Sequence, residues 1–215
     1  MQRILYDYKT KKTVQITSFD LLAFLLCSLI LKQINLKKIN FIKFLLESQI
    51  DKLGMHKSYN ILEHSKFINN LNEMKNVLLF FDIKELDTFD QLILKTTSVL
   101  NQYFHADGSF PLFNGTNNIY TKIIYNSLNK DTYLAKRDFE NTNTGIAFYG
   151  DKEKKIFFDV VQPNKDSISS NLSAGTLSIE VSSYSEKIFT NCGASESFGK
   201  NPEYLRYSAA HSTII

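Results

Sequence analysis

The chain has 215 residues, 43% of them hydrophobic, and a formal net charge of +3 at pH 7. This share of apolar side chains can build a buried core, which excludes an intrinsically disordered chain. The charge is small and the lysines are scattered. Both features argue against a nucleic-acid partner, whereas weak attraction to an acidic polymer is permitted.

The first predicted element is a helix over Leu21–Leu31, the one long apolar run, with Ser18 and Asp20 as capping side chains before it. The run is far shorter than the ~20 residues that cross a bilayer, so it predicts a buried helix and no integral membrane segment. It is badly placed for a signal peptide, because Asp20 precedes it and Lys32 follows it. Cys27, within this run, is expected to be a small buried hydrophobe.

Apolar residues at helical spacing predict three further helices. One carries the apolar face Ile39–Leu46, and the next runs from about Asn60 to Leu79. The last runs from about Thr88 to Phe104, with Asp87 or Thr88 as its cap and with Leu94 among the inward residues.

In the second half the apolar spacing changes to twofold alternation, which predicts short strands separated by polar turns. The runs are Tyr133–Phe139, Ile146–Tyr149, Lys155–Val160, Thr176–Val181, Lys187–Asn191 and Arg206–Ile215. The fourth and fifth runs are expected to be adjacent strands. Helices first and strands second indicate an α+β fold, with a helical domain of residues 1–106 and a sheet domain of residues 107–215.

Several short motifs carry a family resemblance because they occur in a fixed order. They are Leu53–Ser58, Phe104–Gly115, Thr144–Ile146, Phe158-Asp159, Ser173–Glu180, Asn191-Cys192-Gly193 and Ala209–Thr213. Together they resemble the heparinase II/III-like proteins, a family of polysaccharide lyases. The resemblance implies the C-terminal part of an incomplete α/α toroid, followed by the start of an antiparallel β-sandwich domain. Members are much longer than this chain, so truncation at both ends is expected. Members belong to the periplasm or cell envelope, and we expect the same location here.

The resemblance also implies a chemistry, which is β-elimination on a uronate-containing acidic polysaccharide. An Asn or His neutralises the uronate carboxylate, a Tyr or His removes the C5 proton, and a Tyr or His protonates the leaving oxygen. The neutralising residue would lie before residue 1, and Glu63 stands at the position of the Tyr. The isolated chain is therefore expected to show little or no lyase activity. The alternative is a non-catalytic carbohydrate-binding or envelope-structural member of the same fold.

The candidate site residues are polar side chains within or beside these motifs. The candidate catalytic residues are His56, His64, His105 and His211, and the candidate substrate-binding residues are Asp107, Asn114 and Glu180. Structural alternatives stay open for each histidine, and Asp107 can simply cap its own turn. Glu180 alternates with apolar neighbours, so it faces either a groove or solvent.

Some members of the family hold a zinc ion through His and Asp residues of the sheet domain. His211 and Asn191 fall on two of those positions, and Ser173 falls on a third. A hydroxyl and an amide are weak zinc ligands, so we expect no tightly bound zinc and no other cofactor. Asp159 or Cys192 could supply a further ligand, although strand alternation turns Cys192 away from the side of Asn191.

Overall fold

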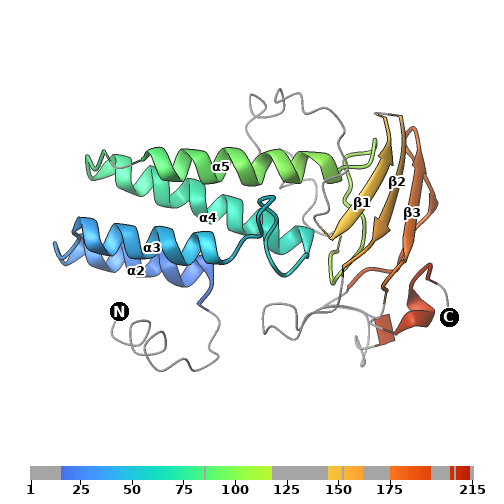
Figure 1. Ribbon diagram of the computed structural model, residues 1–215, viewed down its shortest axis with the longest axis horizontal. Coiled ribbons are helices and arrows are strands. Elements are labelled where there is room, and N and C mark those ends of the chain that lie inside the picture. The colour runs from blue at the N-terminus through green and yellow to red at the C-terminus, as the bar shows by residue number, and fades with distance from the viewer. Residues whose placement is uncertain are drawn as a thin grey trace.

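The computed structural model describes residues 16–84, 86–117, 145–151, 153–161, 175–194, 204–205 and 207–213. Helices come first along the chain and an antiparallel sheet follows, as the change of spacing predicts. Figure 1 shows the helices side by side at one end of the molecule and the sheet at the other. Among the described helices, none combines the length and the apolar character that a bilayer crossing requires.

The first two helices of the described residues, α2 (Ser18–Ile30) and α3 (Leu36–Ser48), each begin at a side-chain cap. Thr17 Oγ1 accepts a hydrogen bond from Asp20 N at 3.2 Å, and Asp20 Oδ2 accepts one from Thr17 N at 2.9 Å. This reciprocal pair is a capping box, so the cap lies one residue before the predicted Ser18. Asn35 caps the second helix by accepting from Lys38 N at 3.0 Å.

The next two helices form an adjacent pair, α4 (Ile61–Phe80) and α5 (Asp87–Leu100). The helix α4 begins one residue after the predicted start at about Asn60, and Asn60 is its cap. The helix α5 has no side-chain cap, so the expected cap at Asp87 or Thr88 is wrong. The last turn of the predicted fourth helix tightens into a 3-10 helix, η1 (Asn101–Tyr103). Such tightening is common where a helix ends against another element.

The helices bury one face each and leave the other in solvent. Cys27 of α2 is exposed and Leu94 of α5 is 57% exposed, so the prediction that both lie inward is wrong. Each is an apolar residue on the outer face of a helix that has neighbours on one side only. The helical core consists of Leu21, Phe24, Leu25, Leu29, Ile39, Ile42, Leu45, Leu46, Ile50, Phe67, Leu71, Met74, Leu78, Phe89 and Leu92.

The sheet has the strand order β1-β2-β3-β4, all antiparallel. The strands are β1 (Ile146–Gly150), β2 (Lys154–Asp159), β3 (Ile179–Ser183) and β4 (Glu186–Phe189). The predicted pairing of the last two is confirmed. The strand β3 begins later than predicted because Leu177, with a φ of 65°, forms a turn before it. The predicted strand Tyr133–Phe139 lies outside the described residues.

The predicted strand Arg206–Ile215 is wrong over the residues that the structure describes. Ser208–Ala210 forms a 3-10 helix, η5, in which the backbone makes i→i+3 bonds. Its amides bond locally, with Ala210 N donating to Tyr207 O at 2.9 Å and His211 N donating to Ser208 O at 3.0 Å.

The inner face of the sheet packs on the ends of the helices. Phe148, Phe157 and Glu180 stand opposite one another on neighbouring strands and are all buried. The two phenylalanines belong to a second core, with Met55, Ile61, Leu62, Ile68, Val99, Leu100, Tyr103, Phe104, Phe110, Phe113 and Ile146. This core draws on helices, sheet and residues 104–117, which we call the connecting segment.

Candidate functional site

The carboxylate of Glu180 is the centre of a buried polar network between the sheet and the connecting segment. Its Oε1 accepts from Leu112 N at 2.8 Å, from Asn191 N at 3.1 Å and from Asn191 Nδ2 at 3.2 Å. Its Oε2 lies 3.1 Å from His105 Nε2 and 3.7 Å from Lys187 Nζ. Because β3 alternates, Glu180 faces the protein interior and is fully buried, so it meets neither solvent nor an open groove.

His105 links this carboxylate to Ser182, because its Nδ1 lies 2.7 Å from Ser182 Oγ. Burial lowers the pKa of His105, and the hydrogen bond to Glu180 only partly opposes that effect. The ring is therefore neutral at pH 7, with Nε2–H donating to Glu180 and Nδ1 accepting from the serine hydroxyl. Burial raises the pKa of Glu180, but the bond from His105 and the charge of Lys187 outweigh it and the net shift is downward. Glu180 is thus ionised.

The connecting segment is fastened to both halves of the protein. Toward the sheet, Lys187 Nζ donates to Phe110 O at 3.3 Å, and Lys155 Nζ donates to Phe104 O. Toward the helices, Ile61 N donates to Thr116 Oγ1 at 3.2 Å, at the start of α4. These bonds fix the position of the sheet relative to the helices.

Two candidate catalytic histidines lie together at the start of α4. His64 is fully buried, its Nδ1 accepts from His56 N at 3.2 Å, and its Nε2 lies 3.0 Å from Thr96 O. Burial lowers its pKa to about 3, so the ring is neutral and Nε2–H is the donor. Both ring nitrogens of His64 are therefore hydrogen-bonded to backbone atoms.

His56 keeps part of its side chain accessible. Its Nδ1 lies 2.8 Å from Ser58 Oγ, and its ring lies 5.5 Å from that of Phe67 between centroids. Burial lowers the pKa of His56 to about 4, and the nearby charge of Glu63 only partly opposes the effect. His56 is neutral at pH 7 and is the more accessible histidine of the pair.

A buried carboxyl group lies at the other end of the connecting segment. Asp159 Oδ1 accepts from Val161 N at 3.1 Å and from Asn114 Nδ2 at 3.4 Å. Burial raises the pKa of Asp159 to about 6, because two hydrogen bonds compensate only in part for the loss of water. Asn114 also donates to Tyr59 O at 3.4 Å, so it ties the loop before α4 to β2.

The remaining predicted residues are placed apart from these groups. Asp107 is exposed and accepts from Ser109 N at 2.9 Å and Ser109 Oγ at 2.6 Å, which is the capping of its own turn. His211 packs against Gly175, where an added Cβ would lie 3.1 Å from its Cγ. Burial lowers the pKa of His211, although the backbone of Leu205 and the charge of Glu180 oppose the effect.

The structure brings His105, Glu180 and Asn191 together, pairs His56 with His64, and pairs Asn114 with Asp159. Sequence reasoning did not single out Ser182 and Lys187. The signal for Ser182 was available, because it lies two residues from Glu180 on the same face of β3. Lys187 carried no comparable signal, because a register shift between β3 and β4 sets its direction.

The described residues do not fit a zinc ion. Asn191 Oδ1 accepts from Ser212 N at 2.8 Å and its Nδ2 donates to Glu180, so both ends of the amide are engaged. His211 has two buried ring nitrogens without a hydrogen bond of normal geometry, but a single imidazole does not make a zinc site. Within the described ranges, no three His, Cys, Asp or Glu side chains gather as a metal site, and Ser173 lies outside those ranges.

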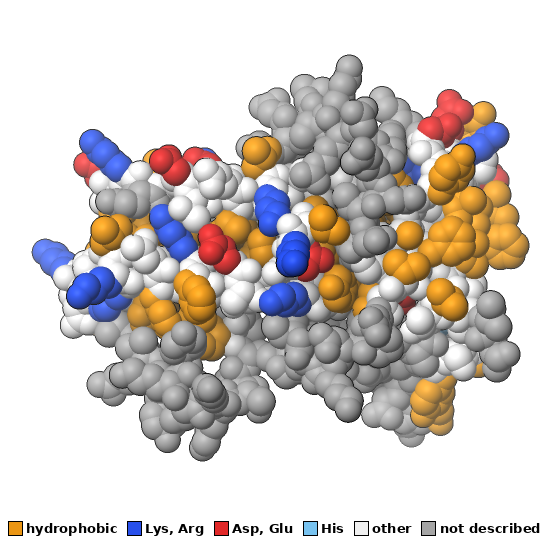
Figure 2. Space-filling view, viewed as in Figure 1, with side chains coloured by type: hydrophobic (Ala, Val, Ile, Leu, Met, Phe, Trp, Pro, Cys, Tyr) orange, Lys and Arg blue, Asp and Glu red, His pale blue; other side chains and the backbone are white. Residues whose placement is uncertain are grey.

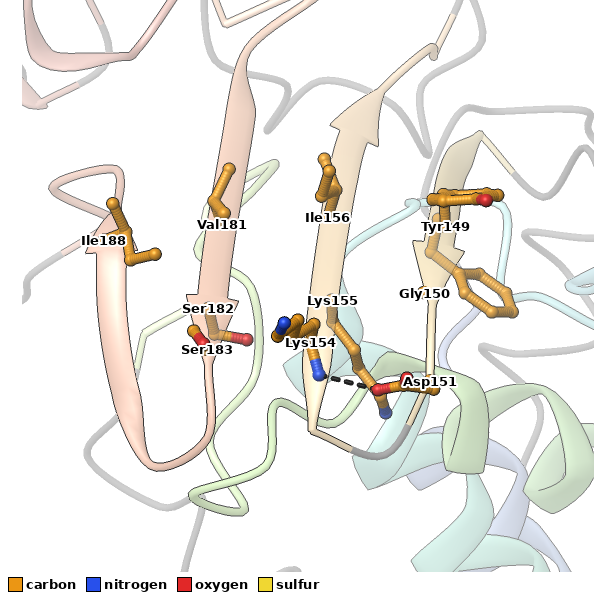
Figure 3. A pocket seen from close by; sticks show the side chains of 11 residues that line it. Tyr149, Gly150, Asp151, Lys154, Lys155, Ile156, Val181, Ser182, Ser183 and Ile188 are labelled. Carbon is orange, nitrogen blue, oxygen red and sulfur yellow. Dashed lines mark hydrogen bonds between the residues drawn. The ribbon is translucent and has the colours of Figure 1, made fainter.

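The outer face of the sheet is apolar and open. A hollow of about 860 Å³ crosses it, and Figure 3 shows Tyr149, Ile156, Val181 and Ile188 in a row over the strands. Figure 2 shows hydrophobic side chains gathered at this end of the molecule. The exposed members include Tyr149, Phe158, Ile188 and Phe189. The hollow is thus a property of the outer face, while the polar network lies on the inner one.

Residues 135–215 match the family described as Heparinase II/III-like, C-terminal. No curated protein matches the chain. The chain is similar to a crystal structure of heparinase III, with 14% identity and a TM-score of 0.72, over 93% of this chain and 38% of that one. It is also similar to the heparan sulfate lyase HepC from Pedobacter heparinus, with 13% identity and a TM-score of 0.58, over 93% of this chain and 35% of that one.

The described chain therefore spans little more than a third of the length of these solved structures. The similarity confirms the resemblance inferred from the motifs. It also confirms the coarse fold, in which helices are followed by an antiparallel sheet of four strands.

Proposed function

We propose that this chain is a section of a carbon–oxygen lyase, because it is similar to heparinase III over 38% of the length of that protein. The complete enzyme would cleave a uronate-containing acidic polysaccharide by β-elimination. The observation that carries the proposal is the family match of residues 135–215, in a chain whose whole fold is similar to heparinase III.

The finer architecture belongs to the same proposal. The helices would be the end of an incomplete α/α toroid (residues 1–106), and the sheet would be the first layer of a β-sandwich (residues 107–215). The exposed outer face supports the second assignment, because a row of apolar side chains such as Tyr149 and Ile188 is suited to cover by another layer.

The described histidines would divide into two groups in such an enzyme. His64 and His105 are buried and fully bonded, so we assign them to the support of the fold. His56 is partly accessible and is the histidine that could meet a sugar, whereas both ring nitrogens of His211 are buried. A neutral imidazole at His56 can accept a proton or share one with a hydroxyl, which is the requirement for acid–base work.

The role of Glu180 and Lys187 would be to hold the connecting segment between the toroid and the sheet. Lyase chemistry depends on placing a carboxylate neutraliser, a base and an acid around one sugar ring. A rigid connection between the two domains would keep these groups at fixed positions relative to one another. Asn114 and Asp159 would serve the same purpose at the far end of the segment.

The test is the appearance of an unsaturated uronate, which absorbs ultraviolet light. Heparan sulfate, hyaluronan and alginate would be incubated with the 215-residue chain and with a longer polypeptide that includes the segment before residue 1. We expect no product from the short chain, because Glu63 stands at the Tyr position. We expect product from the longer one, with a reduced rate after His56→Ala.

Retention of the longer polypeptide on an immobilised polysaccharide, without any product, would reject the lyase and favour a non-catalytic carbohydrate-binding protein. Robust product from the short chain would show that no residues outside these 215 are required. A matched control is Lys57→Ala, which alters the neighbouring residue and leaves the His56 ring in place.

A further inference from the structure

Asn191 lies two residues after the end of β4. By the motif resemblance, zinc-bearing members of the family have an aspartate at this position. We propose that Asn191 is a hydrogen-bonding clip that joins the C-terminal motifs without a metal ion. This inference does not depend on lyase activity, because it concerns how the sheet region is held together.

The clip is visible in the contacts of one amide group. Its Nδ2 donates to Glu180 Oε1 at 3.2 Å, and its Oδ1 accepts from Ser212 N at 2.8 Å. The residue's own N–H also donates to Glu180 Oε1 at 3.1 Å. Since Asn191 is 2% exposed, these bonds form away from water, where leaving one unmade is costly.

Each partner of the amide comes from a different motif. Glu180 belongs to the segment that begins at Ser173, and Ser212 belongs to the last motif. Backbone bonds extend the junction, since Ile179 N donates to Ser212 O at 3.2 Å and Cys192 N donates to Ala210 O at 3.3 Å. The clip thus places the end of the described chain beside β3, with the ring of His211 packed on Gly175.

The chemistry of the contact requires an amide. A carboxylate at position 191 could still accept from Ser212 N, but its second oxygen would face the ionised Glu180 at the distance now bridged by a hydrogen bond. Two carboxylates in a buried site repel each other unless a cation or a proton separates them. An asparagine removes the need for that cation, because it offers a donor to Glu180 and an acceptor to Ser212.

The test compares Asn191→Asp with Asn40→Asp, which adds the same charge on the exposed face of α3. Thermal unfolding of the 215-residue chain would be followed by circular dichroism at pH 7.5, once with a chelator and once with equimolar zinc. We expect the Tm of the wild-type chain to be the same in both. We expect Asn191→Asp to unfold ~5 °C or more below Asn40→Asp, with or without zinc.

The proposal is overturned if Asn191→Asp is as stable as Asn40→Asp. It is also overturned if zinc raises the Tm of the wild-type chain and His211→Ala abolishes the increase. The double variant Glu180→Gln/Asn191→Asp exchanges the amide and the carboxylate across the contact. Its loss of Tm should be smaller than the sum of the two single losses, because two carboxylates face each other only in Asn191→Asp, whereas purely additive losses contradict a direct contact.

If Asn191→Asp does not fold, the proposal can be tested on the wild-type chain by hydrogen exchange. Hydrogen exchange at the amide of Ser212 should be slow, and it should stay slow after metal is removed by the chelator. Fast exchange in the chelator, with protection restored by zinc, would show that a metal and not Asn191 holds this segment.

Discussion

The Nε2 atom of His105 lies 3.1 Å from the Oε2 atom of Glu180, and both side chains are almost completely buried although 75 residues separate them in the sequence. The histidine precedes the turn at the end of the helical half, and the glutamate is in the third strand of the sheet. Their contact, together with the bond from Leu112 N to the same carboxylate, joins the two halves of the protein.

Glu180→Ala should destabilise the chain strongly. The substitution leaves His105, Asn191 and the N–H of Leu112 without their acceptor in a site that water does not reach. Loss of one partner of a buried charged network costs about 3–5 kcal/mol in the free energy of unfolding, which urea denaturation would measure. The matched control is Glu186→Ala, at an exposed position on the adjacent strand, where a change within about 0.5 kcal/mol is expected. Equal effects of the two substitutions would contradict the central role of Glu180.

Asp159→Asn should stabilise the chain at pH 7. Burial raises the pKa of Asp159 from 3.8 to about 6, so the folded state resists ionisation more than the unfolded state does. The free energy of unfolding therefore falls as the pH rises from about 4 to about 6, and the loss is complete at pH 7. Both hydrogen bonds end on Oδ1, which an asparagine can supply. We expect a gain of about 1–2 kcal/mol at pH 7 and none at pH 3.5.

The control for this substitution is Asp151→Asn. Asp151 is exposed, its Oδ1 accepts from Glu153 N and Lys154 N at 2.8 Å each, and these bonds lower its pKa. The same chemical change should therefore lower stability at pH 7 at this position. A gain at position 151, or a loss at 159, would show that burial does not govern the carboxyl of Asp159.

His64 should make the fold sensitive to acid. Burial lowers the pKa of His64 from 6.5 to about 3. Between these two pH values the imidazole is protonated in the unfolded chain and neutral in the folded chain. Stability is fully present above pH 6.5 and falls as the pH drops toward 3, by about 2 kcal/mol between pH 7 and pH 5. In His64→Gln the side-chain amide can still donate to Thr96 O and does not titrate. This variant should have lower stability at pH 7 but a shallower decline between pH 7 and pH 5, which urea titrations at the two values would measure. An unchanged slope would exclude His64 as a source of the acid sensitivity.

Gly150→Ala should be far more harmful than Gly175→Ala. At Gly150, the last residue of β1, φ is 131° and an added Cβ would lie 1.9 Å from Lys154 O. At Gly175 the nearest atom would be His211 Cγ at 3.1 Å, which a small shift of the ring relieves. We expect Gly150→Ala to cost at least about 2 kcal/mol and Gly175→Ala about 1 kcal/mol, from thermal or urea unfolding. A Gly150→Ala chain as stable as the wild type would contradict the turn geometry.

The sequence by itself determined the helices, their order and the helix-to-strand change, because these depend on local periodicity. The family resemblance came instead from short motifs that occur in a fixed order. The start of α4 near Asn60 and the pairing of β3 with β4 follow from residues close together in the chain. The exposed Cys27 and the 3-10 helix near Ser208 were missed, because an apolar run does not say how much of it a neighbouring element will cover.

The polar network was decided only by the tertiary structure. Alternation along β3 showed that Glu180 shares a face with Ser182, but it did not say whether that face meets solvent or protein. The connecting segment settles the question, since it lies on that face and brings His105 and Leu112 to the carboxylate. Lys187 and Asn191 reach Glu180 through the register of β4, which includes a shift that no periodicity predicts. A buried charge is tolerated only where several distant groups converge on it, and that convergence is a property of packing and not of any local segment.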